Sequence, residues 1–548
     1  MKQKLLAIFL ILFFTIVGNA QDILWEKSYG GKHADYLLEA IPTPENGFVV
    51  AGSTISSKTG SLTQETKGNL DYWVCKLDAN GEILWQKTFG GKGLDLLQSV
   101  KLTPDGGMVL AGISNSEAKF DKLDECKGDT DYWIIKLDSH GAEQWQSTIG
   151  GAGQEKLRSI ALTADGGYII GGSSGSNKSE LIEGSNEVDP FGKTENSRGN
   201  LDYWVVKLTA TGNVAWQKTY GGKYLDELKS VVPVPTGGYL LGGYSNSPKS
   251  GDKTDDNIGI GDYWVIKIDN IGTLIWQKTI GGNLDDDLFV LTPTQDGNFI
   301  LAGNSNSSSS NSKSKANGSG TDYWVVKMDT EGGISWQETY NFGKSDILNS
   351  VVENPDGTLL LGGFAQSEAK TNNGNDLGKL LGGSSDKKGI NDYVALKVSP
   401  NGEALWSKSV GSKEADVLEK LLPTPDGGYL LAGTSSGNKS RDKSASKGGK
   451  DFWVVKVKDL VKPEKPEYSI AAYPNPAVNN TSIGVSFAYD YGTATLYDLN
   501  GRQLQQKEIK GEQSIPFNLT DLPSGIYLVK IKTNVQSDGI KIIKSQNK

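Results

Sequence analysis

The chain has 548 residues, a formal net charge of −9 at pH 7 and 69 glycines. With 13 Trp and 21 Tyr, this composition is typical of aromatic strands joined by tight turns, so an all-β class is favoured over helix or disorder. The Lys and Arg residues are interspersed with Asp and Glu instead of forming a basic stripe, which gives no support to a nucleic-acid partner.

Residues 1–20 have the pattern of a secretory signal peptide. Lys2 and Lys4 precede an apolar run from Leu5 to Val17, and cleavage is expected after Ala20. A helix of this length spans only about 20 Å, less than the roughly 30 Å core of a bilayer. We therefore expect no transmembrane span in the mature chain.

Two short strings recur through residues 21–460. The string DYWVVKLD and its variants begin at Asp71, Asp131, Asp202, Asp262, Asp322, Asp392 and Asp451. The string ILWQKTFGG and its variants carry Trp25, Trp85, Trp145, Trp216, Trp276, Trp336 and Trp406. Successive tryptophans are 60, 60, 71, 60, 60 and 70 residues apart, so the repeat is about sixty residues long, with insertions in two copies.

Each repeat contains four extended segments separated by turn signals. In one copy these are LLQSVKLT, MVLAG, DYWIIKLD and EQWQSTIGG, with the Pro104 to Gly107 turn between the first two. Repeated four-stranded units of this length predict a seven-bladed β-propeller with the LLQSVKLT type of strand innermost. Because the first tryptophan strand has no DYW strand before it and the last DYW strand has no tryptophan strand after it, we expect Trp25 to complete the last blade.

The order of these strands resembles NHL, Kelch and WD-repeat propellers, although the diagnostic motif of none of them is present. A linear solenoid is the alternative arrangement. It is less favoured, because the two unpaired strands at the ends complement each other and no polar capping repeat is visible.

The composition changes after residue 460. Residues 461–467 form a linker rich in Pro and charge, and residues 468–548 predict a small Ig-like β-sandwich of roughly seven strands. The motifs YPNP at Tyr473, LYDLNG at Leu496, LPSGIYLV at Leu522 and a final Lys541 to Lys544 segment follow in order.

This ordered set resembles the type A C-terminal sorting domain of the type IX secretion system of Bacteroidota. The resemblance implies that the chain reaches the periplasm by its signal peptide. It also implies that the type IX secretion machinery is a partner and carries the chain across the outer membrane for release or attachment to the cell surface, often with removal of the domain. An Ig-like adhesion domain is the alternative for this segment.

A second acidic residue also recurs once in each repeat. It occupies Asp35, Asp95, Glu155, Asp226, Asp286, Asp346 and Asp416. Two such carboxylates can serve as acid and base in glycoside hydrolysis. A residue present in every blade is better explained as a hydrogen-bonding device at a turn or strand end.

Other chemistry-bearing side chains are scarce. His33 and His140 lie in unrelated repeats, and Cys75 and Cys126 are expected to remain unpaired, although one bridge between them is possible. Two acidic loop clusters lack the spacing of known calcium loops and are interpreted as solvated loops; they are Asp121, Asp124 and Glu125, and Asp252, Asp255 and Asp256. We predict no catalytic residues, no metal site and no cofactor, and leave the ligand-binding residues unassigned.

The loops between the second and third strands distinguish the blades. Their lengths are 18, 18, 29, 18, 18, 28 and 17 residues, so the third and sixth are enlarged. Blade-specific binding is expected on the face that carries these loops. The sequence favours a non-enzymatic secreted or cell-surface propeller that binds glycan or protein. A carbohydrate-active enzyme that uses blade carboxylates and a scaffold module of a surface assembly are the alternatives.

Overall fold

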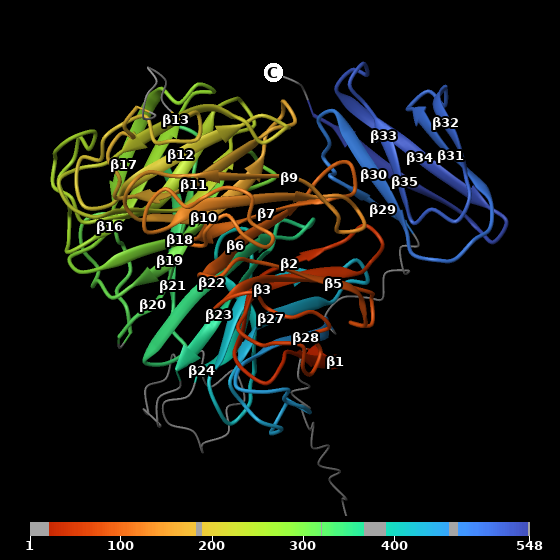
Figure 1. Ribbon diagram of the computed structural model, residues 1–548, viewed down its shortest axis with the longest axis horizontal. Coiled ribbons are helices and arrows are strands. Elements are labelled where there is room, and N and C mark those ends of the chain that lie inside the picture. The colour runs from red at the N-terminus through yellow and green to blue at the C-terminus, as the bar shows by residue number, and fades with distance from the viewer. Residues whose placement is uncertain (1–20, 182–188, 319, 367–390, 460–469, 546–548) are drawn as a thin grey trace, which may run out of the picture.

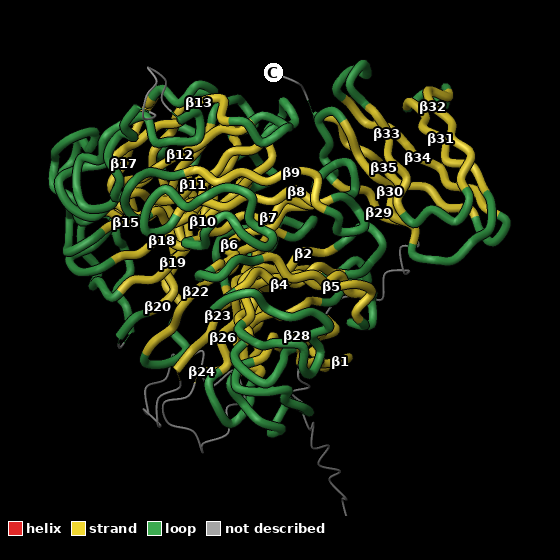
Figure 2. Tube along the Cα trace, viewed as in Figure 1, coloured by secondary structure: helices red, strands yellow, loops and turns green. Residues whose placement is uncertain are grey.

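The computed structural model describes residues 21–181, 189–318, 320–366, 391–459 and 470–545. These residues form nine antiparallel sheets built from strands alone, which confirms the predicted all-β class (Figures 1 and 2). Within the described ranges there is no helix of the length and apolar character that crossing a membrane requires. The expected signal peptide (1–20) and linker (461–467) lie outside these ranges.

Seven of the sheets have four strands each and form the blades of a propeller. The innermost strands are β2 (Asp35–Pro42), β6 (Asp95–Leu102), β10 (Glu155–Leu162), β14 (Asp226–Pro233), β18 (Asp286–Pro293), β22 (Ser345–Glu353) and β26 (Asp416–Pro423). The second strands are β3 (Phe48–Thr54), β7 (Met108–Ser114), β11 (Tyr168–Ser174), β15 (Tyr239–Ser245), β19 (Phe299–Ser305), β23 (Leu359–Gln366) and β27 (Tyr429–Ser435).

The DYW strings form the third strand of each blade, and the tryptophan strings form the outer strand. The third strands are β4 (Asp71–Leu77), β8 (Asp131–Leu137), β12 (Asp202–Leu208), β16 (Asp262–Ile268), β20 (Asp322–Met328), β24 (Asn391–Val398) and β28 (Asp451–Asp459). The outer strands are β5 (Ile83–Phe89), β9 (Glu143–Ile149), β13 (Val214–Tyr220), β17 (Leu274–Ile280), β21 (Ile334–Tyr340), β25 (Ala404–Val410) and β1 (Gln21–Tyr29). We number the blades 1 to 7, from the sheet that begins with β2 to the sheet that begins with β26.

The seven blades close into a ring. Each innermost strand contacts the innermost strand of the next blade, and β26 contacts β2. Strand β1 pairs antiparallel with β28, with Glu26 opposite Val455 and Tyr29 opposite Phe452 (Figure 1, red beside blue). Strand β1 therefore completes the last blade, as the sequence predicts.

The third strands are buried on both faces because they lie between neighbouring blades. In β8, β12 and β16 every residue is buried. The tyrosine of one string packs against the tryptophan of the next, with 4.9 Å between the rings of Tyr72 and Trp133. Tyr72 also donates a hydrogen bond of 3.1 Å to the Trp133 carbonyl oxygen. This contact recurs around the ring, so the regular string is a packing element between blades.

The last two sheets form the predicted Ig-like sandwich. One sheet contains β29 (Ile470–Tyr473), β30 (Asn480–Val485) and β33 (Ser514–Asn518), and the other contains β31 (Gly492–Asp498), β32 (Gln503–Ile509), β34 (Gly525–Thr533) and β35 (Ser537–Lys544). Buried residues from both sheets, including Ile483, Phe517 and Val529, make its core.

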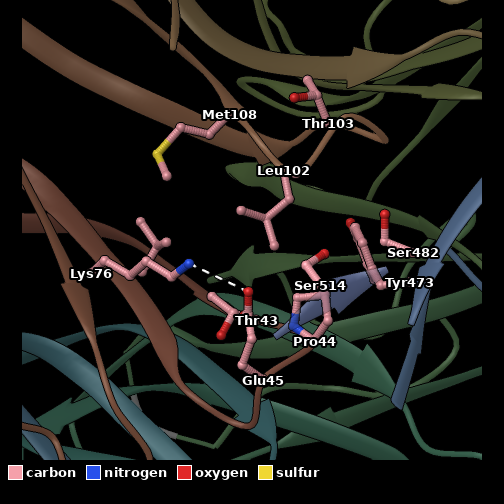
Figure 3. Close-up of a pocket in the computed structure, with 12 residues that line it drawn as sticks. Thr43, Pro44, Glu45, Lys76, Leu102, Thr103, Met108, Tyr473, Ser482 and Ser514 are labelled. Atoms are coloured by element: carbon pink, nitrogen blue, oxygen red, sulfur yellow. Dashed lines mark hydrogen bonds and ion pairs between the residues drawn. The ribbon is translucent and has the colours of Figure 1, made fainter. Parts of the chain in front are cut away.

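The sandwich docks against the turns that join the first and second strands of blades 1 to 3. Asn479 donates from its side-chain amide to the Ala164 carbonyl oxygen at 3.0 Å, and Ser482 donates to the Pro104 carbonyl oxygen at 3.2 Å. Tyr473 packs against the apolar core between blades 1 and 2. Only a cavity of about 20 Å³ remains beside it, room for about one water molecule (Figure 3).

Candidate functional site

The acidic residue at the start of each innermost strand holds the connector from the preceding blade. Asp95 accepts hydrogen bonds from the Gly91 amide at 2.7 Å and the Ser116 hydroxyl at 2.9 Å. Asp226 accepts from Gly222 and Ser247 at the same distances. The repeated carboxylates thus fasten a tight connector to the end of the second strand, which is the structural role that their repetition suggests.

The aspartate that begins each DYW string has a similar local role. Asp71 is fully buried and accepts the Lys67 amide at 2.7 Å. Burial, together with Asp95 on the next blade, raises the pKa of Asp71 to about 6. Two buried carboxyl groups therefore face each other where blades meet, in the same arrangement at interface after interface.

A buried lysine from the loop between the second and third strands accompanies these carboxyl groups in five blades. These lysines are Lys122, Lys193, Lys253, Lys313 and Lys443. Lys253, for example, donates to the Ser247 carbonyl oxygen at 2.7 Å and favours the charged forms of Asp226 and Asp262. Because this set recurs in blade after blade, it belongs to the scaffold.

The remaining candidates from the sequence lie apart from one another. His33 and His140 are exposed. Cys75 is buried, Cys126 is partly buried, and both are free thiols. Within the described residues, no three His, Cys, Asp or Glu side chains come together in a way that could hold a metal ion.

The acidic loop clusters make local contacts. Asp121 forms an ion pair of 2.8 Å with Lys67 of the preceding blade, and Asp252 forms one of 2.9 Å with Arg198. Asp256 accepts the Lys249 amide at 2.8 Å. These carboxylates stabilise the loops and join neighbouring blades, so the structure spreads each cluster over separate partners.

The loops between the second and third strands fold against the outer strand of their own blade. In blade 1, the Gln86 side chain donates to the Ser61 carbonyl oxygen at 2.7 Å and accepts from Trp73 Nε1 at 3.1 Å. The glutamine recurs in blades 2 to 5, where it makes the same contact with the loop, so the common part of these loops is fixed. The insertions in the third and sixth loops include residues 182–188 and 367–390, which lie outside the described residues.

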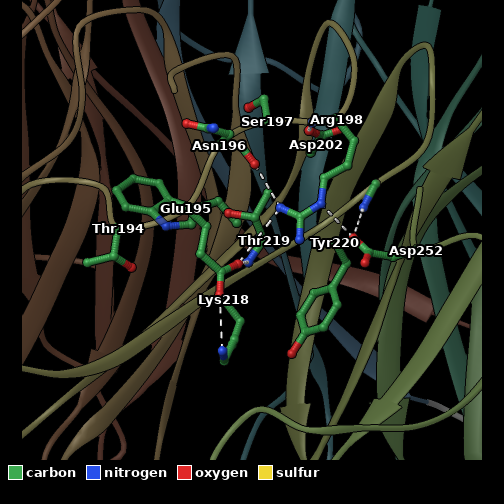
Figure 4. A network of polar contacts seen from close by, with 12 residues as sticks. Thr194, Glu195, Asn196, Ser197, Arg198, Asp202, Lys218, Thr219, Tyr220 and Asp252 are labelled. Atoms are coloured by element: carbon green, nitrogen blue, oxygen red, sulfur yellow. Dashed lines mark hydrogen bonds and ion pairs between the residues drawn. The ribbon is translucent and has the colours of Figure 1, made fainter. Parts of the chain in front are cut away.

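A groove of about 260 Å³ opens where the enlarged third loop meets blade 4 (Figure 4). Glu195 and Arg198 come from this loop, Lys218 and Tyr220 come from outer strand β13, and Asp252 comes from the loop of blade 4. The turn and first residue of β17 complete it with Gly272, Thr273 and Leu274. The groove brings polar and apolar groups of two blades together at one of the two sites that the loop lengths single out.

The charges of this groove neutralise one another. Glu195 accepts from Lys218 Nζ at 3.0 Å and from the Thr219 amide at 2.9 Å. Arg198 donates from Nε to Asp252 at 2.9 Å and lies 3.8 Å from Glu195. Burial raises the pKa of Asp252, but Arg198 opposes this change. The groove therefore offers fixed hydrogen-bonding groups, and both of its carboxylates are engaged by the same guanidinium.

A second group of blade-specific residues lies on the innermost strands and was not predicted from the sequence. Residues that face the ring axis there include Lys156, Arg158 and Glu227, and their charges do not repeat from blade to blade. A comparison of the aligned LLQSVKLT segments for positions that vary in charge would have singled them out.

The end of the chain matches a known family. Residues 471–545 match the family described as the secretion system C-terminal sorting domain. The C-terminal sandwich is a sorting domain of this kind. The sorting domain directs export by the type IX secretion system, which makes that machinery a partner of the chain.

Similarities over other lengths of the chain are distant. A segment of 145 residues, 26% of the chain, is 26% identical to the regulatory protein FlaEY of Caulobacter vibrioides and spans only 15% of that protein. A fungal alcohol oxidase of the AA5 family is 12% identical, with a TM-score of 0.41, over 96% of this chain and 100% of that one. The Pan2 WD40 domain of Neurospora crassa is 11% identical, with a TM-score of 0.30, over 68% of this chain and 90% of that domain. None of these similarities assigns an activity to the propeller.

Proposed function

We propose that the mature chain is a non-enzymatic binding protein, displayed on the cell surface or released, whose propeller binds a glycan or a protein. The observation that supports this most directly is the groove between blades 3 and 4. It combines hydrogen-bonding groups with the apolar surface of Leu274 and Tyr220, a combination typical of ligand sites. It also lies beside an enlarged loop, where variation in a rigid scaffold usually carries recognition.

The carboxylates argue for binding over hydrolysis. An acid and base pair needs two carboxyl groups in different environments, one held protonated and the other ionised. Glu195 and Asp252 instead share Arg198 as a partner. The buried repeated carboxylates are covered by the connectors and by the next blade, which leaves them out of reach of a polysaccharide.

The proposal is tested by a glycan and protein binding screen on the mature chain, residues 21–548. Lys218→Glu reverses a charge in the groove and is expected to weaken binding of a captured ligand by roughly 10-fold or more, since it removes a charged partner. Lys87→Glu makes the same change at the corresponding position of blade 1 and should leave binding unchanged. Equal loss in both variants would argue against the groove.

Two other outcomes would replace the proposal. Release of reducing ends from a polysaccharide, abolished by Glu195→Gln in a folded protein, would indicate a carbohydrate-active enzyme. Stable co-purification with surface proteins, without binding of soluble ligands, would indicate a scaffold module.

The proposed route begins with cleavage of residues 1–20 and ends at the outer surface. Removal of residues 468–548 is expected to leave the folded propeller in the periplasm, because the sorting domain that the machinery recognises is gone. Cell fractionation with antibody against the propeller measures this. Surface delivery of the truncated chain would contradict the proposed route.

A further inference from the structure

The innermost strands alternate between residues that pack into the blades and residues that face the ring axis. In β6, Asp95 and Leu97 are buried, whereas Leu96 and Gln98 are partly exposed. The same alternation begins each of the other innermost strands. Because the rest of the blade covers the outer side of these strands, the exposed positions line the axial channel that propellers enclose.

The axial channel has two unlike walls. The charged wall, on blades 3 to 5, consists of Lys156, Arg158, Glu227, Lys229 and Asp287. The apolar wall, on the other blades, consists mainly of Tyr36, Leu38, Leu96, Ile347 and Val417, and the polar residues Gln98, Asn349 and Glu419 interrupt it. The positions of the innermost strands that pack into the blades repeat closely from blade to blade. The exposed positions differ between blades, and packing alone does not require this difference.

Most charges of the charged wall are paired with each other. Glu227 accepts from Lys156 at 2.9 Å and from Lys229 at 2.8 Å. Lys229 also lies 3.9 Å from Asp287. These two lysines hold the pKa of Glu227 at about 2 against the effect of burial. The pairs fix the wall and leave little net charge on blade 4.

Arg158 differs from these residues. It is the exposed residue of β10, and it donates one hydrogen bond, from Nη1 to Gln98 Oε1 at 3.1 Å. Among the described residues, no carboxylate lies within ion-pair distance of its guanidinium, although Arg158 favours the charged forms of both Asp287 and Glu419. Glu419 is on blade 7, so the guanidinium reaches toward the far side of the channel.

The far side of the channel does not compete for Arg158. Burial raises the pKa of Glu419 to about 8, although Lys420 and Arg158 lower it. Asn349 donates to Glu419 Oε2 at 3.3 Å and to the Leu418 carbonyl oxygen at 2.9 Å. The guanidinium thus keeps a free planar set of donors, which matches the two oxygens of a carboxylate.

We propose that the axial channel binds a small organic acid, with its carboxylate on Arg158 and its ring or apolar body against Tyr36 and Leu38. This site is separate from the groove of the proposed function and is independent of it. The ligand class follows from one guanidinium without an ion pair, in a channel to which the other blades contribute mainly apolar side chains. A neutral molecule of the same shape lacks the negative charge that pairs with the guanidinium. An inorganic anion lacks an apolar part that can pack against Tyr36 and Leu38.

The test uses three probes on the mature chain, residues 21–548, by isothermal titration calorimetry and ligand-observed NMR. Benzoate carries both features, benzamide is its neutral counterpart, and phosphate is an anion without an apolar body. We expect saturable binding of benzoate and at least tenfold weaker binding of the other two. Arg158→Gln should reduce benzoate binding by roughly 10- to 100-fold, and Arg158→Lys should retain part of it.

Arg502→Gln is the matched control, because Arg502 is an exposed arginine of the sorting domain and lies outside the ring. It should bind benzoate like the unmodified chain, and all variants should show the same unfolding transition. The proposal is overturned if benzoate fails to bind at millimolar concentration, if benzamide binds equally well, or if Arg158→Gln binds like the unmodified chain. Tighter binding of phosphate than of benzoate would also overturn it in favour of an inorganic-anion site.

Discussion

Trp453 donates a hydrogen bond of 2.7 Å from Nε1 to Glu26 Oε2, between residues 427 positions apart in the chain. In blade 1 the equivalent bond joins Trp73 to Gln86 within one hairpin. Glu26 also accepts the Ser444 amide at 2.9 Å, as Gln86 accepts the Thr63 amide. The first strand therefore reproduces, without a hairpin, the contacts that hold an outer strand elsewhere in the ring.

Loss of the Glu26 contacts should weaken ring closure. Glu26→Ala leaves the buried indole N–H of Trp453 without an acceptor, so we expect the free energy of unfolding to fall by about 1–3 kcal/mol. Glu26→Gln introduces the residue type of blades 1 to 5 and should be nearly neutral. Chemical denaturation measures both, with Gln86→Ala as the reference for the same loss inside a hairpin.

Deletion of residues 21–31 extends this test. It removes all of β1 and exposes the edge of β28, so the melting temperature should fall by more than in any single variant. An unchanged melting temperature after the deletion would contradict a closure that depends on β1.

The sequence predicts the ring because its packing elements must repeat. Every blade needs a doubly covered third strand and a connector held by an acidic residue, so Asp71 and Asp95 have counterparts throughout. The axial residues were not predicted, because their direction depends on a register shift near the middle of each innermost strand, as between Leu37 and Glu39. For the groove, the loop lengths predicted only a location. They could not predict which side chains line it.

The docking of the sorting domain was also beyond the sequence. It depends on a close approach of Gly484 to Pro44, two residues that no local pattern connects. Such a contact follows from the shapes of two separately folded surfaces. Local sequence propensities determine the strands on each side of the contact, but they do not determine that the two surfaces dock.

Stability should fall as the pH rises from about 4 to 7. The pKa values of Asp35, Asp71, Asp202 and Asp262 are raised by burial from 3.8 to about 6. In this window the folded chain binds more protons than the unfolded chain, so each unit of pH lowers the free energy of unfolding. A carboxylate with a lowered pKa, such as Glu227, acts in the opposite direction but only below about pH 4.5.

Thermal unfolding at intervals between pH 4.5 and 7.5 measures this dependence. Asp71→Asn keeps an oxygen for the Lys67 amide but no longer titrates, so its slope should be smaller than that of the unmodified chain. Asp498→Asn changes an exposed carboxyl whose pKa is lowered by the Arg502 amide, and it should leave the slope intact. A melting temperature that rises steadily from pH 4.5 to 7 would refute the raised pKa values.

Substitution of Gly484 should separate the sorting domain from the propeller. A β-carbon at Gly484 would lie 2.1 Å from the backbone of Pro44, so Gly484→Val cannot keep the docked position. Valine suits a strand, and the sandwich itself should stay folded. Small-angle scattering should show a larger radius of gyration, and amide exchange should increase at the Thr43 to Gly47 turn.

Gly539→Val is the matched control for this change. Gly539 lies on β35 of the same domain, where the nearest atom to an added β-carbon is 3.7 Å away. This variant should scatter like the unmodified chain. Compact scattering from Gly484→Val as well would mean that the docked arrangement does not depend on this contact.

The indole N–H groups of the outer-strand tryptophans Trp276 and Trp406 differ in their hydrogen bonding. Trp276 Nε1 donates to the Thr330 carbonyl oxygen in the hairpin turn of the next blade at 3.3 Å. Trp406 faces blade 7, whose third and outer strands are not joined by a hairpin, and its buried Nε1 has no acceptor among the described residues. Trp276→Phe should therefore cost about 1 kcal/mol more than Trp406→Phe in the free energy of unfolding. Both variants lose similar apolar area, so the difference isolates the hydrogen bond, and an equal or larger loss in Trp406→Phe would contradict an unpaired indole at the closure.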